Sequence, residues 1–203
     1  MKKIILTLGL VLAFGLANAQ DKKPASTGEG FANGDVFVTG LISYGNTNDK
    51  NTDTKTDSFK LIPQVALFVS DNIAVGVRVG FTTDKTKTAG TTTVDNPGFL
   101  AGAFARYYFT PASKFSLFGQ LGYDYMSKTD NLALPNKIKT YSNNFGLGLG
   151  LNYFVSSNFS IETGLALLNF GNEKTDVSGD NGNTSFKIGG DFTKLSIGVN
   201  YKF

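Results

Sequence analysis

The 203-residue sequence contains no cysteine, histidine or tryptophan, and each absence removes a class of function. Without cysteine there is no disulfide scaffold, no thiolate metal site, no cysteine nucleophile and no lipid anchor of the kind attached to an amino-terminal cysteine. Without histidine the commonest general base is missing, so a Ser–His–carboxylate triad is impossible. With 19 basic and 16 acidic residues the chain also lacks the basic excess of a nucleic-acid-binding protein, and we expect no nucleic-acid partner.

Long apolar runs are missing too, apart from one near the first residue. Residues 4–16 (IILTLGLVLAFGL) form an apolar stretch that follows two lysines and precedes the small-x-small sequence ANA. A membrane helix needs about 20 apolar residues, whereas this combination is typical of a secretory signal peptide. We therefore expect residues 1–19 to be a signal peptide cleaved before Gln20. Residues 20–34 are polar and without periodicity, which predicts a flexible periplasmic lead-in.

The chain is rich instead in glycine, with 24 residues, and in aromatic side chains, with 18 Phe and 8 Tyr. These residues occur in segments where apolar and polar positions alternate. Val, Ile, Phe, Tyr and Thr dominate the segments and the apolar period is 2, which predicts strands rather than helices. Eight such segments can be counted: 35–45, 58–69, 73–83, 98–109, 115–126, 141–154, 159–170 and 192–203. The sequence therefore predicts a single all-β domain over residues 35–203.

Connections between the segments alternate between long and short. Four are long and polar, such as GNTNDKNTDTKTD and DKTKTAGTTTVDNP, and three are short, at 70–72, 110–114 and 155–158. In an up-and-down arrangement this alternation places all long loops at one end. Eight strands of even length usually close, because closure removes exposed edges. We therefore expect an eight-stranded antiparallel up-and-down barrel. We also expect residues 186–190 to extend the last hairpin, with a bulge at Gly189 and Gly190 that switches the register.

Two kinds of barrel fit this pattern: a soluble one with an apolar interior, and a transmembrane one whose apolar face meets lipid. Aromatic residues on the apolar face form two belts, as membrane interfaces favour. One belt lies near the long loops (Tyr44, Phe59, Phe81, Phe99, Tyr125, Phe145) and the other near the short turns (Phe109, Phe115, Tyr153, Phe159, Tyr201, Phe203). On one strand their separation projects to roughly 25 Å in a tilted barrel, the height of the apolar band of outer-membrane barrels. The belts favour the transmembrane barrel.

The face of the first strand stays open. Val36, Val38, Ile42 and Tyr44 compete with Phe37 and Leu41 for the outward side. Both sets obey the period of 2, so periodicity alone does not choose between them.

The polar face of the strands combines many glycines with isolated charges of both signs. A narrow barrel is filled by its own side chains, and glycine leaves room for long polar side chains to cross and pair. Buried charges need partners, so we expect a polar network in the lumen. Its predicted members are Arg78, Arg106, Gln120, Asp124, Glu162 and Lys194, with the three cations available to the two carboxylates.

The final segment reads KLSIGVNYKF, and its apolar face carries Leu195, Ile197, Val199, Tyr201 and Phe203. An eight-strand pattern ending in this way resembles the small eight-stranded outer-membrane β-barrels of Gram-negative bacteria, the OmpX, OmpW and opacity-type "porin family" group, over residues 35–203. The resemblance implies that the barrel-assembly machinery recognises these five residues during insertion. It also implies a location in the bacterial outer membrane, in contact with lipid and lipopolysaccharide. We expect a monomer.

Candidate sites for nucleotides, metals and catalysis are weak. GLGLGLNYF has glycines at period 2 and no following helix, which favours a strand over a phosphate loop. DKNTDTKTD begins with the spacing of a calcium loop but lacks its glycine and its bidentate glutamate. We therefore expect no metal and no cofactor. Asp124 and Glu162 could in principle act as a carboxylate pair, but carboxylates flanked by arginines are more often structural. The outer-membrane barrel enzymes that offer a comparison resemble one another in using a histidine in the site, and this chain has none, so we expect no enzymatic activity.

Two functions remain for such a barrel. The first is a structural or surface-interaction role, in which four long polar loops contact a host, a phage, neighbouring cells or lipopolysaccharide. The second is a narrow porin-like channel for small solutes. A lumen that holds Arg78, Arg106 and Phe118 leaves little continuous water, so the sequence favours the surface role.

Overall fold

The computed structural model describes residues 28–133, 137–190 and 196–203. Nine strand elements are found among them: β1 Val36–Asp49, β2 Thr54–Phe68, β3 Ile73–Thr88, β4 Thr91–Tyr108, β5 Phe115–Asp130, β6 Ile138–Phe154, β7 Phe159–Thr175, β8 Asn183–Ile188 and β9 Ser196–Lys202. The described residues include no helix with the length and apolar character needed to cross a membrane. The predicted signal peptide, residues 1–19, lies outside the described residues.

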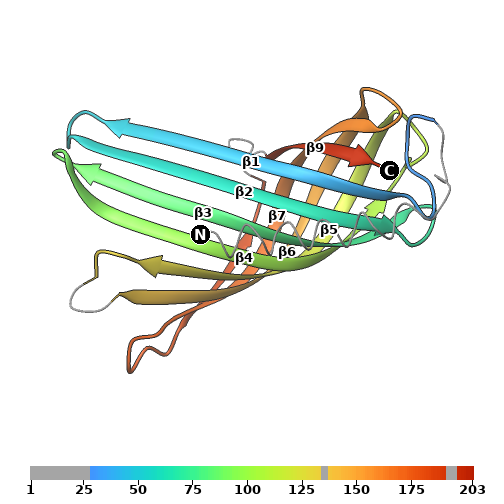
Figure 1. Ribbon diagram of the computed structural model, residues 1–203. Helices are drawn as coiled ribbons and strands as arrows, with labels where there is room; N and C mark the ends of the chain where they lie inside the picture. Colours follow the sequence, from blue (N-terminus) through green and yellow to red (C-terminus); the bar gives the residue numbers. More distant parts are fainter. Residues whose placement is uncertain (1–27, 134–136, 191–195) are drawn as a thin grey trace.

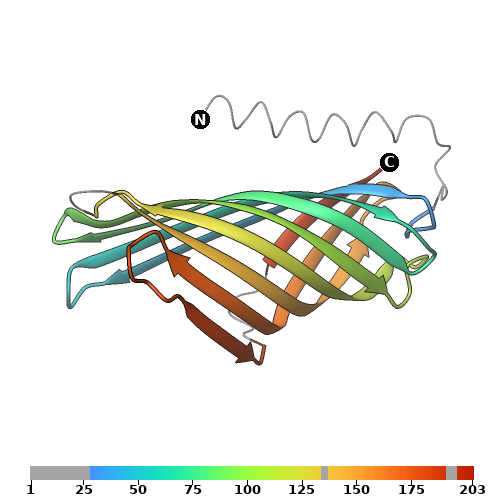
Figure 2. The ribbon, with the colours of Figure 1, turned by 90° about the horizontal axis from the view of Figure 1, so that it is seen from below.

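The sheet closes on itself to form a barrel (Figures 1 and 2). Strands β1 to β7 each pair antiparallel with the next in the chain, and β9 pairs with both β7 and β1. Because β8 and β9 both lie against β7, they are two parts of the last barrel strand. The predicted eight-stranded antiparallel up-and-down barrel is therefore confirmed.

The last strand changes register between its two parts. Leu168 pairs with Ile188 of β8, and Gly164 pairs with Ser196 of β9. The two partners on β7 are four residues apart in the sequence, whereas those on β8 and β9 are eight residues apart. Gly189 has a φ of 128°, which favours glycine. This agrees with the predicted switch of register at Gly189 and Gly190. On the amino-terminal side of Gly189, β8 lies apart from β1 at the end of the barrel that carries the long connections (Figures 1 and 2).

The prediction of four long loops is wrong in one respect, because most of their residues belong to strands. Strands β1 and β2 stay paired up to Asp49 and Thr54, and β3 and β4 stay paired up to Thr88 and Thr91. The sequence prediction ended each strand where apolar side chains end. Threonine, however, is β-branched and favours a strand in water as well as in lipid. The four long connections are therefore extended β-hairpins.

Two local features explain the second hairpin. Its turn consists of Ala89 and Gly90, whose φ values of 48° and 76° are those of a two-residue type I′ turn, the turn that matches strand twist. The second feature joins this hairpin to the first one, because the hydroxyls of Thr56 on β2 and Thr86 on β3 lie 3.2 Å apart. Such cross-strand threonine pairs stabilise a sheet outside the lipid band.

The apolar face of the strands points outward, as the sequence predicts for a transmembrane barrel. On β9, Ile197 and Val199 are exposed, whereas Asn200 is buried in the lumen. The structure also decides the face of the first strand: Phe37 is fully buried, while Tyr44 is 68% exposed. Val36, Val38, Ile42 and Tyr44 therefore form the outward side, and Phe37 and Leu41 the inward side.

Residues 28–34 of the predicted flexible lead-in pack into the short-turn end of the barrel. Phe31 is only 1% exposed, and its ring centroid lies 4.8 Å from those of Phe68 and Phe154. Its backbone N–H donates to the carbonyl of Pro111 at 2.7 Å. The rest of the lead-in, residues 20–27, lies outside the described residues. Sequence reasoning missed this contact because Phe31 is a single aromatic residue in a polar segment without periodicity.

Candidate functional site

The lumen is filled in layers, beginning at the short-turn end. The first layer, which we call the aromatic plug, consists of Phe31, Phe37, Phe68, Tyr108 and Phe154, each buried and in ring contact with at least one other. Four of these residues lie at or next to the ends of strands of the wall, and Phe31 fills the space among them. The plug leaves this end of the barrel occupied by packed rings.

Lys202 of β9 links the last strand to Phe154 of the aromatic plug and to residues 28–35. Its ammonium donates to the carbonyls of Gly30 at 2.6 Å and Gly28 at 3.0 Å, and lies 3.8 Å from Asp35 Oδ2. It also lies 5.3 Å from the ring centroid of Phe154. These contacts hold residues 28–35 in the barrel mouth and satisfy a lysine that is 2% exposed.

Arg106 of β4 is the centre of the next layer. Its Nη1 and Nη2 donate to Oε2 and Oε1 of Glu162 on β7, at 2.8 and 3.0 Å. Its Nε donates to Gln120 Oε1 at 2.7 Å, and Nη1 reaches the Tyr108 hydroxyl at 3.1 Å. The Phe118 ring covers the guanidinium at 4.5 Å. A two-pronged pair of this kind fixes the orientation of both charges while burying them.

Amides and a hydroxyl complete the layer around Glu162. Asn200 Nδ2 donates to Glu162 Oε2 at 3.0 Å, to Asn152 Oδ1 at 2.8 Å and to Ser160 Oγ at 3.0 Å. Gln64 Nε2 approaches Glu162 Oε1 at 3.4 Å. The predicted site omitted these four partners, although the period of 2 places Asn152, Ser160 and Asn200 on the polar face. Attention to uncharged polar residues at inward positions could have found them.

Arg78 of β3 and Asp124 of β5 form a second ion pair nearer to the hairpin end. Arg78 Nε donates to Oδ1 at 2.6 Å and Nη2 to Oδ2 at 2.8 Å. The pair lies close to the wall because Gly102 and Gly122 face it: a Cβ on Gly102 would overlap Asp124 Oδ1, and one on Gly122 would lie 2.7 Å from Arg78 Nη2. The glycines therefore make room for the charges, as expected in a narrow barrel.

The structure brings together five of the six predicted network residues, in two separate groups. Arg78 meets Asp124, whereas Arg106 meets Glu162 and Gln120. Lys194 of the predicted network and Leu195 of the predicted assembly signal lie outside the described residues. Of the other signal residues, Ile197, Val199 and Tyr201 point outward, and Phe203 packs on the Tyr201 ring at 4.9 Å.

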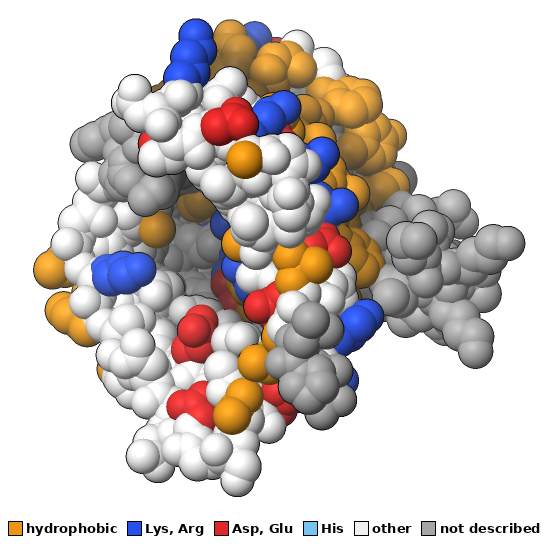
Figure 3. All heavy atoms as spheres, turned by 90° about the vertical axis from the view of Figure 1, so that its left-hand side faces the viewer, with side chains coloured by type: hydrophobic (Ala, Val, Ile, Leu, Met, Phe, Trp, Pro, Cys, Tyr) orange, Lys and Arg blue, Asp and Glu red, His pale blue; other side chains and the backbone are white. Residues whose placement is uncertain are grey.

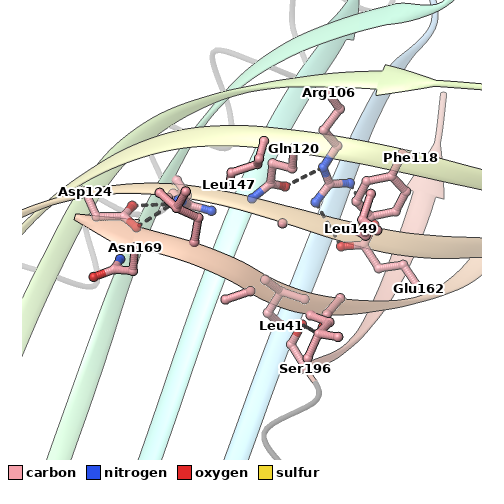
Figure 4. A pocket seen from close by; sticks show the side chains of 17 residues that line it. Leu41, Arg106, Phe118, Gln120, Asp124, Leu147, Leu149, Glu162, Asn169 and Ser196 are labelled. Carbon is pink, nitrogen blue, oxygen red and sulfur yellow. Dashed lines mark hydrogen bonds and ion pairs between the residues drawn. The ribbon is translucent and has the colours of Figure 1, made fainter. Parts of the chain in front are cut away.

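A cavity of about 310 Å³ lies between the two ion pairs (Figure 4). Both arginines, both carboxylates, Gln120, Asn169, Leu41 and Phe118 line it, together with glycine-rich parts of β6 and β7. Figure 3 looks into the barrel from the hairpin end and shows a hollow that carries acidic and basic side chains. Both carboxylates are held by an arginine. The arrangement can therefore bind polar groups but offers no free carboxylate pair for acid–base catalysis.

Comparison with known proteins gives the family. The crystal structure of OprG from Pseudomonas aeruginosa has a TM-score of 0.54 and 16% identity, covering 86% of this chain and 98% of that chain. Neisserial surface protein A (NspA) has a TM-score of 0.51 and 17% identity, covering 85% and 99%. These identities show the fold alone, and no curated protein matches the sequence. The family model of the outer membrane protein beta-barrel domain, however, matches residues 6–203. The chain therefore belongs to the outer membrane protein β-barrel domain family.

Proposed function

We propose that this outer-membrane β-barrel acts at the cell surface through its four extended hairpins, and that it is neither a channel nor an enzyme. The observation that carries the proposal is the aromatic plug at the short-turn end. An axial path would have to displace Phe31, which touches Phe37, Phe68, Tyr108 and Phe154. Five packed rings leave no water column there.

The ion pair next to the plug supports the same conclusion. Arg106 and Glu162 span the lumen from β4 to β7 and are 2% and 3% exposed. Opening a path would separate two buried charges, which is strongly unfavourable when neither gains another partner. Both carboxylates that could have served as catalytic groups are engaged in this way, which favours a non-enzymatic role.

The hairpins have the character of a recognition surface. On β1, Asp49 lies five residues beyond Tyr44 of the belt, about 17 Å at 3.4 Å per residue. Asn46 Nδ2 donates to Asp57 at 2.6 Å, and Lys85 lies 3.7 Å from Asp95 on the next pair of strands. Paired strands with a polar surface form stiff ribbons that can present fixed side chains to lipopolysaccharide or to another cell. The outward belts would meet membrane lipid.

Trimmed barrels test the surface role. We would replace residues 45–58 and residues 82–98 each by Asn-Gly, which cuts two hairpins back to the belt pairs Tyr44–Phe59 and Phe81–Phe99. Expressed in a Gram-negative host that lacks the protein, the trimmed barrel should insert and remain heat-modifiable on a gel. Its cells should lose the adhesion to cultured cells, or the survival in serum, that the full chain confers. Unchanged adhesion and survival would contradict the proposal.

A narrow channel for small solutes is the alternative, and the cavity open at the hairpin end is the observation in its favour. Planar-bilayer recordings distinguish the two. We expect closed traces for the full chain and for Arg106→Ala, because the plug remains in both proteins. Steady single-channel steps from the full chain would establish the channel instead.

A further inference from the structure

At four inward-facing glycines of the barrel, a side chain already occupies the place where a Cβ would stand: Phe104 at Gly76, Asp124 at Gly102, Arg78 at Gly122 and Phe118 at Gly150. Gly146 of β6 differs, because its Cβ would meet only Leu168 O at 3.7 Å and Asn169 Nδ2 at 3.9 Å. Gly146 lines the luminal cavity. Packing therefore does not require this glycine, and the space above it stays open.

Polar atoms without protein partners border that space. Gln120 gives its Oε1 to Arg106, and Arg78 uses Nε and Nη2 on Asp124. Within residues 28–133, 137–190 and 196–203, no hydrogen bond engages Gln120 Nε2, Arg78 Nη1 or the amide of Asn169. Gln120, Asn169 and Asp124 lie around one space in Figure 4. Three hydrogen-bonding groups from β3, β5 and β7 thus face the cavity, each held in place by its own strand.

The charges around the cavity restrict the ligand. Among the described residues that line the cavity, the two arginines and the two carboxylates are paired with each other, so these residues carry no net charge to compensate an ion stripped of water. A neutral ligand with several hydroxyl groups fits better, because each hydroxyl both donates and accepts. The free Nε2 of Gln120 can donate to it, the Asn169 amide can do both, and Asp124 has further lone pairs. Leu41 and Phe118 offer apolar surface to C–H groups.

Size and access agree with this ligand class. A volume of about 310 Å³ lies at the small end of ligand pockets, which run from about 300 to 1,000 Å³. The hollow at the hairpin end is visible in Figure 3, and the aromatic plug closes the other end. We propose that the lumen is a blind pocket that binds one small neutral polyhydroxylated solute, of monosaccharide or sugar-alcohol size, from the hairpin side. This site is separate from the surface role of the hairpins.

The experiment uses the folded full barrel in a detergent without sugar head groups. Glucose and sorbitol are titrated while ¹H–¹⁵N spectra follow the side-chain amides of Gln120 and Asn169, with sodium acetate and alanine as ionic comparators. We expect saturable shifts with glucose or sorbitol and none with acetate or alanine. Gly146→Leu should fill the cavity and weaken binding at least tenfold. Gly119→Leu is the matched control, because its Cβ meets nothing within 4 Å on the lipid face, and its binding should be unchanged.

Three outcomes would overturn the proposal. No saturable shift with either polyol would remove the site, and equal shifts with acetate or alanine would reject the ligand class. Undiminished binding by Gly146→Leu would place the ligand elsewhere. Heat-modifiable migration checks that each variant folds. Asn169→Ala needs no new space, so it provides a second test if Gly146→Leu does not fold, and a tenfold loss of affinity is again expected.

Discussion

Phe31 and Phe68 stack with their ring centroids 4.8 Å apart and their planes at 26°, although one precedes the barrel and the other ends its second strand. Through this contact, part of the polar segment before β1 closes the lumen at the short-turn end. It also joins residues 28–34 to the folding unit, so the stability of the barrel should depend on a residue that is not part of its wall.

We expect Phe31→Ala to lower the free energy of unfolding by about 3–5 kcal/mol, because it removes a fully buried ring and leaves a cavity among four others. Urea unfolding in lipid vesicles measures the change. Phe186→Ala is the control, since Phe186 is 61% exposed on β8 and its loss should change stability by no more than about 0.5 kcal/mol. Equal effects of the two variants would mean that Phe31 does not act as a plug.

Arg106 and Glu162 should behave as one unit. Arg106→Met alone leaves the buried Glu162 carboxylate without its cation and should lower the free energy of unfolding by about 3–5 kcal/mol. Arg106→Met combined with Glu162→Leu removes both charges and should lower it by less than the two single changes added together. A double-mutant cycle from the same unfolding measurements gives the coupling. Simple additivity would show that the 2.8 Å contact contributes nothing.

At glycines in contact with luminal charges, even the methyl side chain of alanine should destabilise the barrel. The Cβ of Gly102→Ala would overlap Asp124 Oδ1 and lie 2.5 Å from the carbonyl oxygen of Tyr123. We therefore expect the free energy of unfolding to fall by about 1–3 kcal/mol. Gly119→Ala, on the lipid face with free space around it, should be neutral. Thermal loss of heat-modifiable migration ranks the two variants. A tolerant Gly102 would show that the Arg78–Asp124 pair can move.

Asp180 in the turn of the last hairpin provides a pH test. Hydrogen bonds from the Thr175 hydroxyl, the Thr175 N–H at 2.6 Å and the Gly182 N–H at 2.8 Å lower the pKa of its carboxyl to about 2. A lowered carboxyl pKa stabilises the turn above the unfolded value of about 3.9, and this contribution disappears as pH falls through about 2. The amide shift of Gly182 should therefore titrate near pH 2. The same midpoint in Asp180→Asn would assign the titration to another group.

We propose that Phe203 acts in assembly more than in stability. Its backbone N–H donates to the Val36 carbonyl at 3.0 Å whatever its side chain, while its ring rests on Tyr201 at the outer surface. Phe203→Ala should therefore reduce insertion in cells but refold from urea into micelles like the unaltered chain. Phe159→Ala, which removes another ring beside Tyr201, should insert normally. Equal insertion of both variants would contradict a specific role for Phe203 as an assembly signal.

Much of the wall could be predicted because the outward face has to be apolar at every second residue. Tyr201, Val199 and Ile197 lie outward for that reason, and the inward positions of Arg78 and Arg106 follow from the same period. The hairpins could not be bounded in this way, because above the lipid band both faces of a strand are polar. Paired strands therefore continue to Asp49 and Thr88 without any apolar signal.

The sequence by itself determined the strand class, the closed barrel, the two aromatic belts and the inward position of the four charges in the two ion pairs, because all of these follow from a period of 2 and from composition. Only the tertiary structure decided that Arg78 pairs with Asp124, 46 residues away, and Arg106 with Glu162, 56 residues away. It also decided that Phe31 plugs the lumen and that Gly146 borders an open cavity. These contacts depend on the registers of several strands at once, which no single segment of the chain specifies.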